Sequence, residues 1–277
     1  MGKIKIYRDV AKLKSIEMFY FDTKTEGPTI LCLHGRWGRA ETWYDFIQHY
    51  GKQYRVIAPD QRGHGLSSKP ISKYTAEEMA EDIIELLKFL NIDSVILVGH
   101  SMGGRIAGYL TSLYPEYVKA LAILDRSASG LPKPNMVSLE EIPTCDPLTN
   151  DWSLPFSSLS EARKFIQQVT DSDLSYQYFM NSLYETVEGY KMRFSSQAIA
   201  AGIYNDEDWF HILPSIKCPV LLIRAKCHEG IPDEDFIKMQ SLISNCVAGE
   251  MSHPDHNVHL GNKEEFYEYF DDFLKRR

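Results

Sequence analysis

The chain has 277 residues, of which 44% are hydrophobic and 25% are charged, a composition that suits one large globular domain and argues against a disordered chain. Its 30 Lys and Arg residues against 38 Asp and Glu residues give a formal net charge of −8, and no basic stripe offsets it, which argues against nucleic-acid and membrane partners. No segment approaches the roughly 20 apolar residues of a membrane span or the pattern of a signal peptide, so the sequence predicts a cytoplasmic protein.

Short apolar runs of strand length alternate with helix-like segments along most of the chain. Helices are predicted at residues 75–90, where Thr75 and Glu78 match a capping box, and from Phe266 to Leu274. Strands are predicted near residues 16–21, 29–34, 55–58, 95–98, 121–124, 220–224 and 246–250. The central strands are almost continuously apolar, as strands covered on both faces are. This alternation is typical of an α/β fold with a mostly parallel sheet and helices on both faces.

The most informative motif follows the strand at residues 95–98. The segment Gly99-His100-Ser101-Met102-Gly103 joins that apolar strand directly to a helix-compatible segment at residues 105–114. A Gly-x-Ser-x-Gly pattern between a strand and a helix predicts a nucleophile elbow, in which the serine hydroxyl projects from the edge of the sheet beside the free N–H groups of the helix. Gly99 and Gly103 have no Cβ atom, so the two backbones can approach closely around Ser101. We therefore expect a nucleophilic serine rather than an incidental one in a glycine-rich turn.

Three further segments stand in an order that resembles the α/β-hydrolase superfamily. Residues 29–35, which end in His34-Gly35, are similar to the strand and turn that supply half of the oxyanion hole in that family. Residues 60–67 resemble the loop after the family's next strand, and residues 256–266 resemble the segment that carries its catalytic histidine. The resemblance covers residues from about 16 to about 275, apart from one insert. It implies the α/β-hydrolase fold, and it carries little information about the substrate.

Residues 127–213, called the insert below, break the strand–helix alternation. They open with turn-forming residues and continue with aromatic segments that predict helices beginning near Ser160 as N-cap, over residues 173–190 and over residues 194–204. In the resembling family a helical insert after the sixth strand is a cap over the active site. The predicted organisation is thus a first core part at residues 1–126, a helical cap at 127–213, and a second core part at 214–277 that carries the catalytic histidine.

A nucleophilic serine needs a base, and nine histidines are present. The resemblance implies structural roles for His34 and His64, and His100 is expected to point into the fold. The family places its catalytic histidine at a fixed distance before the phenylalanine that opens the last helix, and counting back from Phe266 selects His256. The neighbouring candidates are His253 and His259.

The spacing of these last three histidines also raises the possibility of a metal site. Pro254 breaks a helix there, and no carboxylate or cysteine has a clear ligand spacing, so we predict no metal and no cofactor. The five cysteines form no Cys-x-x-Cys pair and are expected to be free thiols.

The histidine base in turn needs a carboxylate that orients it, which completes a catalytic triad. For this carboxylate the chain departs from the commonest pattern of the resembling family. Many relatives have an aspartate after the strand at residues 220–224, where this chain has His228. Asp125 lies 24 residues beyond Ser101, at the end of the sixth strand, and matches the position that a subset of the family uses. The alternatives are that Asp125 is only a strand-end residue and that Glu229 or Asp233 supplies the carboxylate.

The oxyanion hole and the substrate contacts are predicted at the same edge of the sheet. The resemblance implies that the backbone N–H groups of Arg36 and Met102 stabilise the oxyanion. Arg36, Arg105, Arg126 and Arg224 all lie near carboxyl ends of strands, where open α/β sheets place their sites. One or two of these arginines are candidates for binding a substrate carboxylate, and the alternative is that each forms an ordinary ion pair.

Together these features predict a serine hydrolase that cleaves a small ester, lactone or amide through an acyl-enzyme intermediate. The family's epoxide hydrolases and haloalkane dehalogenases have an aspartate in place of Ser101, so their alkyl-ester chemistry is not expected. The alternatives are a carbon–carbon hydrolase, haloperoxidase-like or lyase reaction on the same triad, and a receptor or signalling module with a slow triad. The expected partner is a small-molecule substrate, and the sequence does not predict the oligomeric state.

Overall fold

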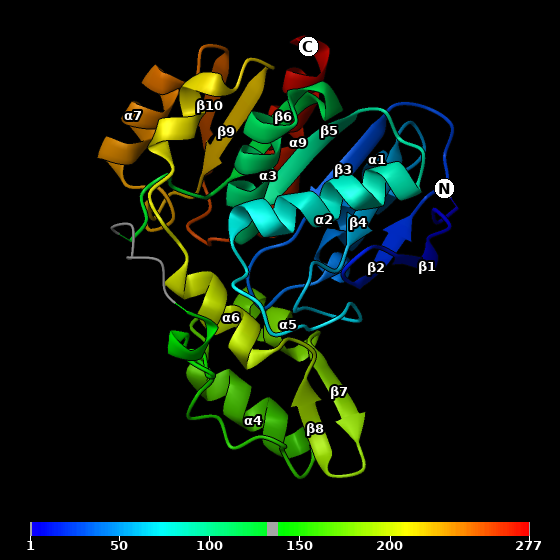
Figure 1. The fold of residues 1–277 in the computed structure, drawn as a ribbon, viewed down its shortest axis with the longest axis vertical. Coiled ribbons are helices and arrows are strands. Elements are labelled where there is room, and N and C mark those ends of the chain that lie inside the picture. The colour runs from blue at the N-terminus through cyan, green and yellow to red at the C-terminus, as the bar shows by residue number, and fades with distance from the viewer. Residues whose placement is uncertain (1, 132–137, 277) are drawn as a thin grey trace.

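The computed structural model describes residues 2–131 and 138–276, which fold around one eight-stranded sheet (Figure 1). The strand order is β1-β2-β4-β3-β5-β6-β9-β10. The first two strands are antiparallel to their neighbours, and the rest of the sheet is parallel. The strands are β1 (Tyr7–Lys12), β2 (Glu17–Asp22), β3 (Thr29–Leu33), β4 (Arg55–Pro59), β5 (Val95–His100), β6 (Val118–Leu124), β9 (Val220–Arg224) and β10 (Cys246–Glu250). The predicted α/β-hydrolase fold class is confirmed; β1, an edge strand, was not predicted.

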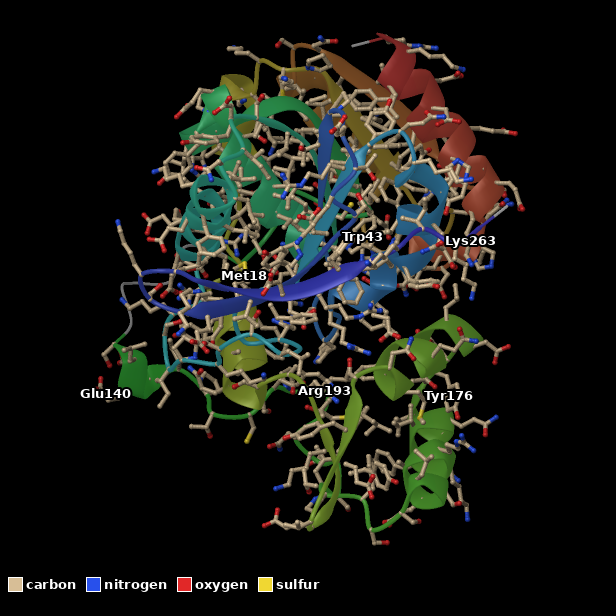
Figure 2. The ribbon with its side chains drawn as sticks, turned by 90° about the vertical axis from the view of Figure 1, so that its right-hand side faces the viewer. Met18, Trp43, Glu140, Tyr176, Arg193 and Lys263 are labelled. Atoms are coloured by element: carbon tan, nitrogen blue, oxygen red, sulfur yellow. The ribbon has the colours of Figure 1, made fainter. Side chains whose placement is uncertain are left out.

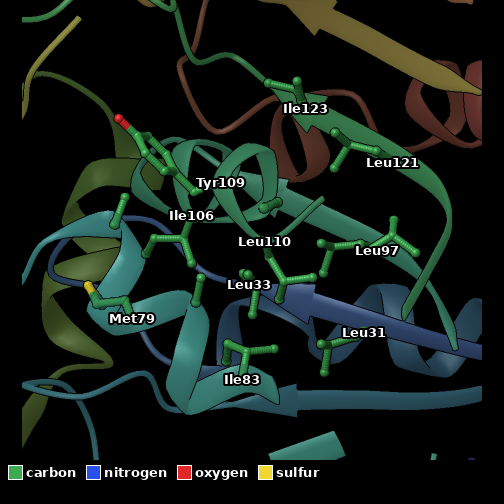
Figure 3. Close-up of a cluster of buried hydrophobic side chains, with 14 of the residues drawn as sticks. Leu31, Leu33, Met79, Ile83, Leu97, Ile106, Tyr109, Leu110, Leu121 and Ile123 are labelled. Atoms are coloured by element: carbon green, nitrogen blue, oxygen red, sulfur yellow. The ribbon is translucent and has the colours of Figure 1, made fainter. Parts of the chain in front are cut away.

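Helices cover both faces of the sheet. The core helices are α1 (Tyr44–Tyr50), α2 (Ala76–Phe89), α3 (Met102–Leu113), α7 (Asp233–Leu242), α8 (Val258–Gly261) and α9 (Lys263–Arg276), with short 3-10 turns η1 (Ala40–Trp43) and η2 (Pro115–Tyr117). One buried cluster joins α2, α3 and α7 to one face of the sheet, and its centre is drawn in Figure 3. A second cluster joins α1 and α9 to the other face. Successive strand residues such as Leu31 and Cys32 enter opposite clusters, which explains why the central strands are apolar at every position.

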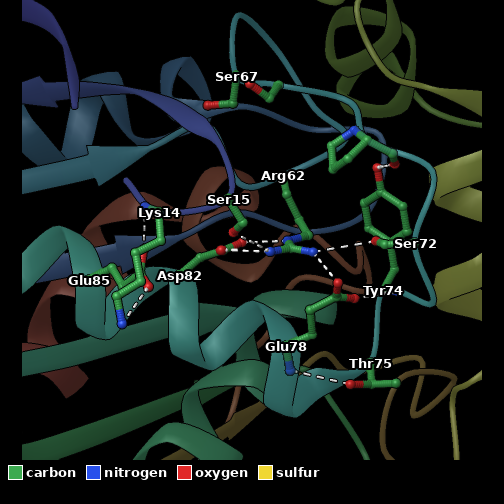
Figure 4. A network of polar contacts seen from close by, with 12 residues as sticks. Lys14, Ser15, Arg62, Ser67, Ser72, Tyr74, Thr75, Glu78, Asp82 and Glu85 are labelled. Carbon is green, nitrogen blue, oxygen red and sulfur yellow. Dashed lines mark hydrogen bonds and ion pairs between the residues drawn. The ribbon is translucent and has the colours of Figure 1, made fainter. Parts of the chain in front are cut away.

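The loop at residues 60–67 is fixed by a buried ion-pair network (Figure 4). Arg62 donates to Asp82 of α2 with an Nη2–Oδ1 distance of 2.6 Å and also pairs with Glu78. Thr75 caps α2 by accepting a hydrogen bond from the Glu78 N–H at 3.2 Å. The Glu78 carboxylate accepts from the Tyr74 N–H rather than from Thr75, so only half of the predicted capping box forms. These contacts hold the loop to α2 and give it a structural role.

Most of the insert forms a lobe next to the core (Figures 1 and 2). In Figure 2, Tyr176 marks the lobe and Trp43 marks the core. The insert has its own small hydrophobic cluster, which includes Trp152, Phe156 and Phe179. Its elements are η3 (Leu139–Glu141), α4 (Leu159–Val169), α5 (Asp173–Met180), β7 (Leu183–Thr186), β8 (Gly189–Met192) and α6 (Ser196–Tyr204). The 3-10 turn η4 (Phe210–Ser215), in which the predicted boundary at residue 213 falls, packs on α3 and α7 of the core instead.

Two local predictions for the insert are wrong. The N-cap of α4 is Ser158 rather than Ser160, because the Ser158 hydroxyl accepts from the Glu161 N–H at 3.1 Å. The helix expected over residues 173–190 ends at Met180, and an antiparallel hairpin of β7 and β8 follows it.

Within the described residues, no helix is long and apolar enough to cross a lipid bilayer.

Candidate active site

Ser101 occupies a strained turn between β5 and α3. Its backbone angles are φ 51° and ψ −119°, in the positive-φ range that is costly for a residue with a Cβ atom. A Cβ atom on Gly99 would lie 2.2 Å from the Gly103 carbonyl oxygen, and one on Gly103 would lie 2.4 Å from the Leu33 oxygen. The Ser101 N–H donates to the Leu124 oxygen at 2.9 Å, which ties the turn to β6. Only glycine fits on either side, so the motif is a consequence of this close backbone approach.

His256 and Asp125 form a close pair beside this turn. His256 Nδ1 lies 2.6 Å from Asp125 Oδ2. Asp125 is fully buried, and its second oxygen accepts a hydrogen bond from the Ala225 N–H at 2.9 Å. Because an ionised carboxylate only accepts hydrogen bonds, this contact favours the proton on Nδ1 and leaves the Nε2 lone pair free. The imidazole is 44% exposed and lines a cavity together with Ser101.

The alternative acids make other contacts. Asp233 is 68% exposed and pairs with Arg224 at 2.6 Å. Glu229 lines the cavity, but among the described residues the carboxylate that contacts His256 belongs to Asp125. His228, which stands where many relatives have an aspartate, has a φ of 59° and lies 2.9 Å from Glu250. The geometry therefore favours the sixth-strand position for the acid.

The other buried histidines near the site are neutral structural groups. His34 donates from Nδ1 to the Gly35 oxygen at 2.8 Å and accepts from the Gln61 N–H at 2.9 Å, and burial lowers its pKa to about 4. His259 stacks on Trp43 with ring centroids 4.3 Å apart, and burial lowers its pKa to about 3.

His100 packs against His256, with ring centroids 4.8 Å apart. Its Nε2 contacts the His256 carbonyl oxygen at 2.9 Å, so it helps to fix the backbone that carries His256. Burial also holds the pKa of His100 well below its usual value. Throughout residues 2–131 and 138–276, no three His, Cys, Asp or Glu side chains gather as metal ligands would.

The turn that carries Arg36 passes directly beside Ser101. A Cβ atom on Gly35 would lie 3.2 Å from Ser101 Cβ, and the Gly38 N–H closes the turn by donating to the Gly35 oxygen at 3.1 Å. Met102 is the first residue of α3, where the N–H groups have no partner within the helix. The two predicted oxyanion donors thus belong to segments that adjoin Ser101.

The cavity above Ser101 has a volume of about 470 Å³ and is shared between the core and the insert. Insert residues that sequence reasoning did not single out line one side of it. Tyr178 of α5 packs against the turn at residues 35–38, because a Cβ atom on Gly38 would lie 2.0 Å from its hydroxyl oxygen. The insert residues in the lining are Leu148, Val169, Thr170, Asp171, Ser175, Tyr178 and Phe179.

Three of the four candidate arginines lie together. Arg36 and Arg126 line the cavity, and both pair with Asp206 of the insert. Arg105 lies behind them, 3.7 Å from the same carboxylate. Arg224 is not among the described residues that line the cavity; it pairs with Asp233 and Glu250 instead, so the expectation that it faces the substrate is not supported. No motif marks Asp206, and sequence reasoning missed it.

Comparisons with known proteins give one family and several similar structures. A family model described as the alpha/beta hydrolase fold matches residues 28–245. A Haemophilus influenzae protein named for esterase/lipase activity is 26% identical over 236 residues, which cover 84% of this chain and 78% of that protein. The 2-(acetamidomethylene)succinate hydrolase of Mesorhizobium japonicum is 36% identical over 102 residues, so this chain spans only 37% of its length and the match covers 37% of this chain. The crystal structure of an E-2-(acetamidomethylene)succinate hydrolase has a TM-score of 0.82 at 22% identity, covers 98% of this chain and 100% of the other, and shows the shared fold.

Proposed function

Because the chain belongs to the α/β-hydrolase fold family, we propose that it is a cofactor-independent serine hydrolase that cleaves a small ester, lactone or amide through an acyl-enzyme intermediate. The observation that carries this proposal is the buried Asp125 carboxylate 2.6 Å from His256 Nδ1, in a cavity that Ser101 also lines. An oriented base beside a strained serine is the arrangement that acyl transfer requires.

In the proposed mechanism, Ser101 Oγ attacks the substrate carbonyl carbon while His256 Nε2 takes the hydroxyl proton. Asp125 holds the Nδ1–H tautomer and stabilises the imidazolium that forms. The Arg36 and Met102 N–H groups stabilise the negative charge on the former carbonyl oxygen. The bond to the leaving group then breaks, and the leaving group takes the proton from His256. Water attacks the acyl-enzyme by the same route, which releases the acid and restores Ser101.

We also propose that the insert is a cap that selects the substrate. Helices α4 and α5 contribute to the cavity lining, and the small hydrophobic cluster of the insert gives these helices a fixed arrangement. Residues 1–126 and 214–277 then supply the catalytic groups. The names of the two curated relatives, an esterase/lipase and a hydrolase of a succinate derivative, support hydrolysis without specifying the substrate.

Labelling with a fluorophosphonate probe, followed by assays with p-nitrophenyl butyrate, tests this function. The probe is expected to label the wild-type protein and not Ser101→Ala, and p-nitrophenol release is expected only from the wild type. Absence of labelling would reject Ser101 as a nucleophile. Labelling without turnover on a panel of esters, lactones and N-acyl amides would favour the receptor alternative.

A further inference from the structure

A cluster of three arginines and one aspartate lies next to the active-site cavity. Arg36 Nη2 lies 3.2 Å from Asp206 Oδ2, while Arg126 Nη2 and Arg105 Nε approach the other oxygen of the same carboxylate. The three guanidinium groups come from the core, and the carboxylate comes from the segment after α6 in the insert. Three positive charges against one negative charge leave an excess of two positive charges in this cluster.

The donors of this cluster are incompletely used. The Nε–H groups of Arg36, Arg105 and Arg126 are buried, and none has a hydrogen-bond partner among the described residues. The negative charge of Asp146 also acts on Arg36, but the Asp146 carboxylate already accepts hydrogen bonds from other groups, including the Leu148 N–H at 3.0 Å. Burial lowers the pKa of both Arg36 and Arg126, the direction expected for cations with insufficient negative charge nearby. A buried excess of positive charge is costly unless an anion compensates it.

The arginine cluster lies next to the residues that are proposed to carry out the reaction. Arg36 lies in the turn that carries a predicted oxyanion donor, and Arg126 follows Asp125, so both arginines are joined directly to parts of the proposed catalytic site. They line the same cavity as Ser101. Asp171 and Glu229 also line this cavity, and their negative charges oppose an anion elsewhere in it. The charge distribution therefore favours one orientation, with an anionic group at the arginines.

We propose that Arg36 and Arg126, with Arg105 behind them, form a carboxylate-binding subsite, so that the substrate is an ester, lactone or amide that carries a free carboxylate near its scissile carbonyl group. This inference rests on the proposed hydrolase function. Arginine matches a carboxylate with two parallel N–H donors, and Asp206 takes only one hydrogen bond from Arg36 and one from Arg126. The buried Nε–H groups are not open to a ligand, but the Arg36 and Arg126 side chains line the cavity and are 19% and 16% exposed, so a second carboxylate can approach their other N–H donors. Asp206 holds these guanidinium groups in place for it.

Equilibrium binding to the full-length Ser101→Ala protein tests the subsite without turnover. Monoethyl succinate and ethyl butyrate have acyl chains of the same length, and only the first carries a carboxylate. We expect isothermal titration calorimetry to show at least about tenfold tighter binding of monoethyl succinate, because a charge-assisted bidentate contact is worth at least that factor. Equal affinity for the two esters, or binding of neither, would overturn the proposal.

Variants in the same Ser101→Ala background identify the residues responsible. Arg126→Gln is expected to abolish most of the preference for the anionic ester, and Arg36→Gln, which keeps the backbone N–H, is a second variant in case the first does not fold. The matched control is Arg224→Gln, which alters an arginine outside the cavity and is expected to keep the preference. A preference that survives both Arg126→Gln and Arg36→Gln would show that the cluster only fastens the insert.

The design separates this inference from the proposed function. A carboxylate preference in the binding assay, together with a wild-type protein that hydrolyses none of the esters, lactones and N-acyl amides of the panel, would reject the hydrolase function and keep the subsite. Hydrolysis of p-nitrophenyl butyrate without any carboxylate preference would keep the hydrolase function and reject the subsite.

Discussion

The core side and the insert side of the cavity differ in how their residues are fixed. On the core side, Ser101, Asp125 and His256 lie on turns at the ends of parallel strands, where Gly99 and Gly103 permit backbone contacts that no other residue allows. On the insert side, the lining comes from helices α4 and α5, whose side chains meet few backbone constraints. The proposed reaction chemistry is thus tied to backbone geometry that leaves a motif in the sequence, while the substrate selection proposed for the insert would depend on side chains that leave none.

If the core side carries the reaction chemistry, substitutions there should have the largest effects on kcat. Ser101→Ala and His256→Ala are each expected to lower kcat roughly 10⁴- to 10⁶-fold, and the double variant little further, because the two residues act as one unit. The measurement is ester turnover at saturating substrate. His253→Ala is the matched control, since the His253 ring accepts from the Asp255 N–H at 3.1 Å, and a much smaller loss is expected. An inactive His253→Ala with an active His256→Ala would show that the base is misassigned.

The acid is the next test of the core side. Asp125→Asn is expected to lower kcat about 10³- to 10⁴-fold while the protein stays folded, because an amide favours the wrong tautomer of His256. Glu229→Gln and Asp233→Asn are the controls, and each is expected to retain most of the activity. Circular dichroism would check folding. If Asp233→Asn or Glu229→Gln showed the loss of kcat expected for Asp125→Asn, and Asp125→Asn itself stayed active, the acid would lie after β9.

The same division between the core side and the insert side separates the features that could be predicted from the sequence from those that could not. The elbow and the turn at His34-Gly35 were predicted because each is a short motif at a strand end. Asp125 and His256 were predicted from their spacing to Ser101 and to Phe266 in the resembling family. The hairpin of β7 and β8 was predicted as helix, because a short aromatic segment does not distinguish the two structures until its tertiary partners are known. Asp206 was missed because no motif or family position marks it, so nothing in the sequence links it to Arg36, which lies 170 positions away.

The loss of folding stability at acid pH is also expected to come from the core more than from the insert, and it is a smaller effect than the losses of activity described above. The insert contains one histidine, His211, whereas the core buries His34 and His259 with pKa values of about 4 and about 3. Their folded pKa values lie below the unfolded value of 6.5, so the unfolded chain binds more protons below about pH 6.5 and the free energy of unfolding falls as the pH falls toward 3. Each such histidine is expected to cost about 2 kcal/mol by pH 5.

His259→Phe tests this acid sensitivity. Neither ring nitrogen of His259 has a hydrogen-bond partner among the described residues, so phenylalanine keeps the stacking on Trp43 without losing a hydrogen bond. Urea unfolding at pH 7.5 and pH 5 is expected to show a smaller loss of stability in the variant than in the wild type. An identical loss in both proteins would contradict a neutral, buried His259.

The last prediction compares a glycine of the insert with a glycine of the core, and its insert variant has the smallest expected effect. Gly202 lies inside α6 of the insert, and a Cβ atom there would meet nothing within 4 Å. Gly202→Ala is therefore expected to stabilise the protein by about 0.5 to 1 kcal/mol, because alanine loses less conformational entropy than glycine when a helix forms. Gly99→Ala is the matched core change and is expected to destabilise by about 2 kcal/mol or more, since its Cβ atom would lie 2.2 Å from a backbone oxygen that side-chain motion cannot move. Urea unfolding midpoints measure both changes; if they shifted stability in the same direction, the contrast between a backbone-limited core side and a freer insert side would be lost.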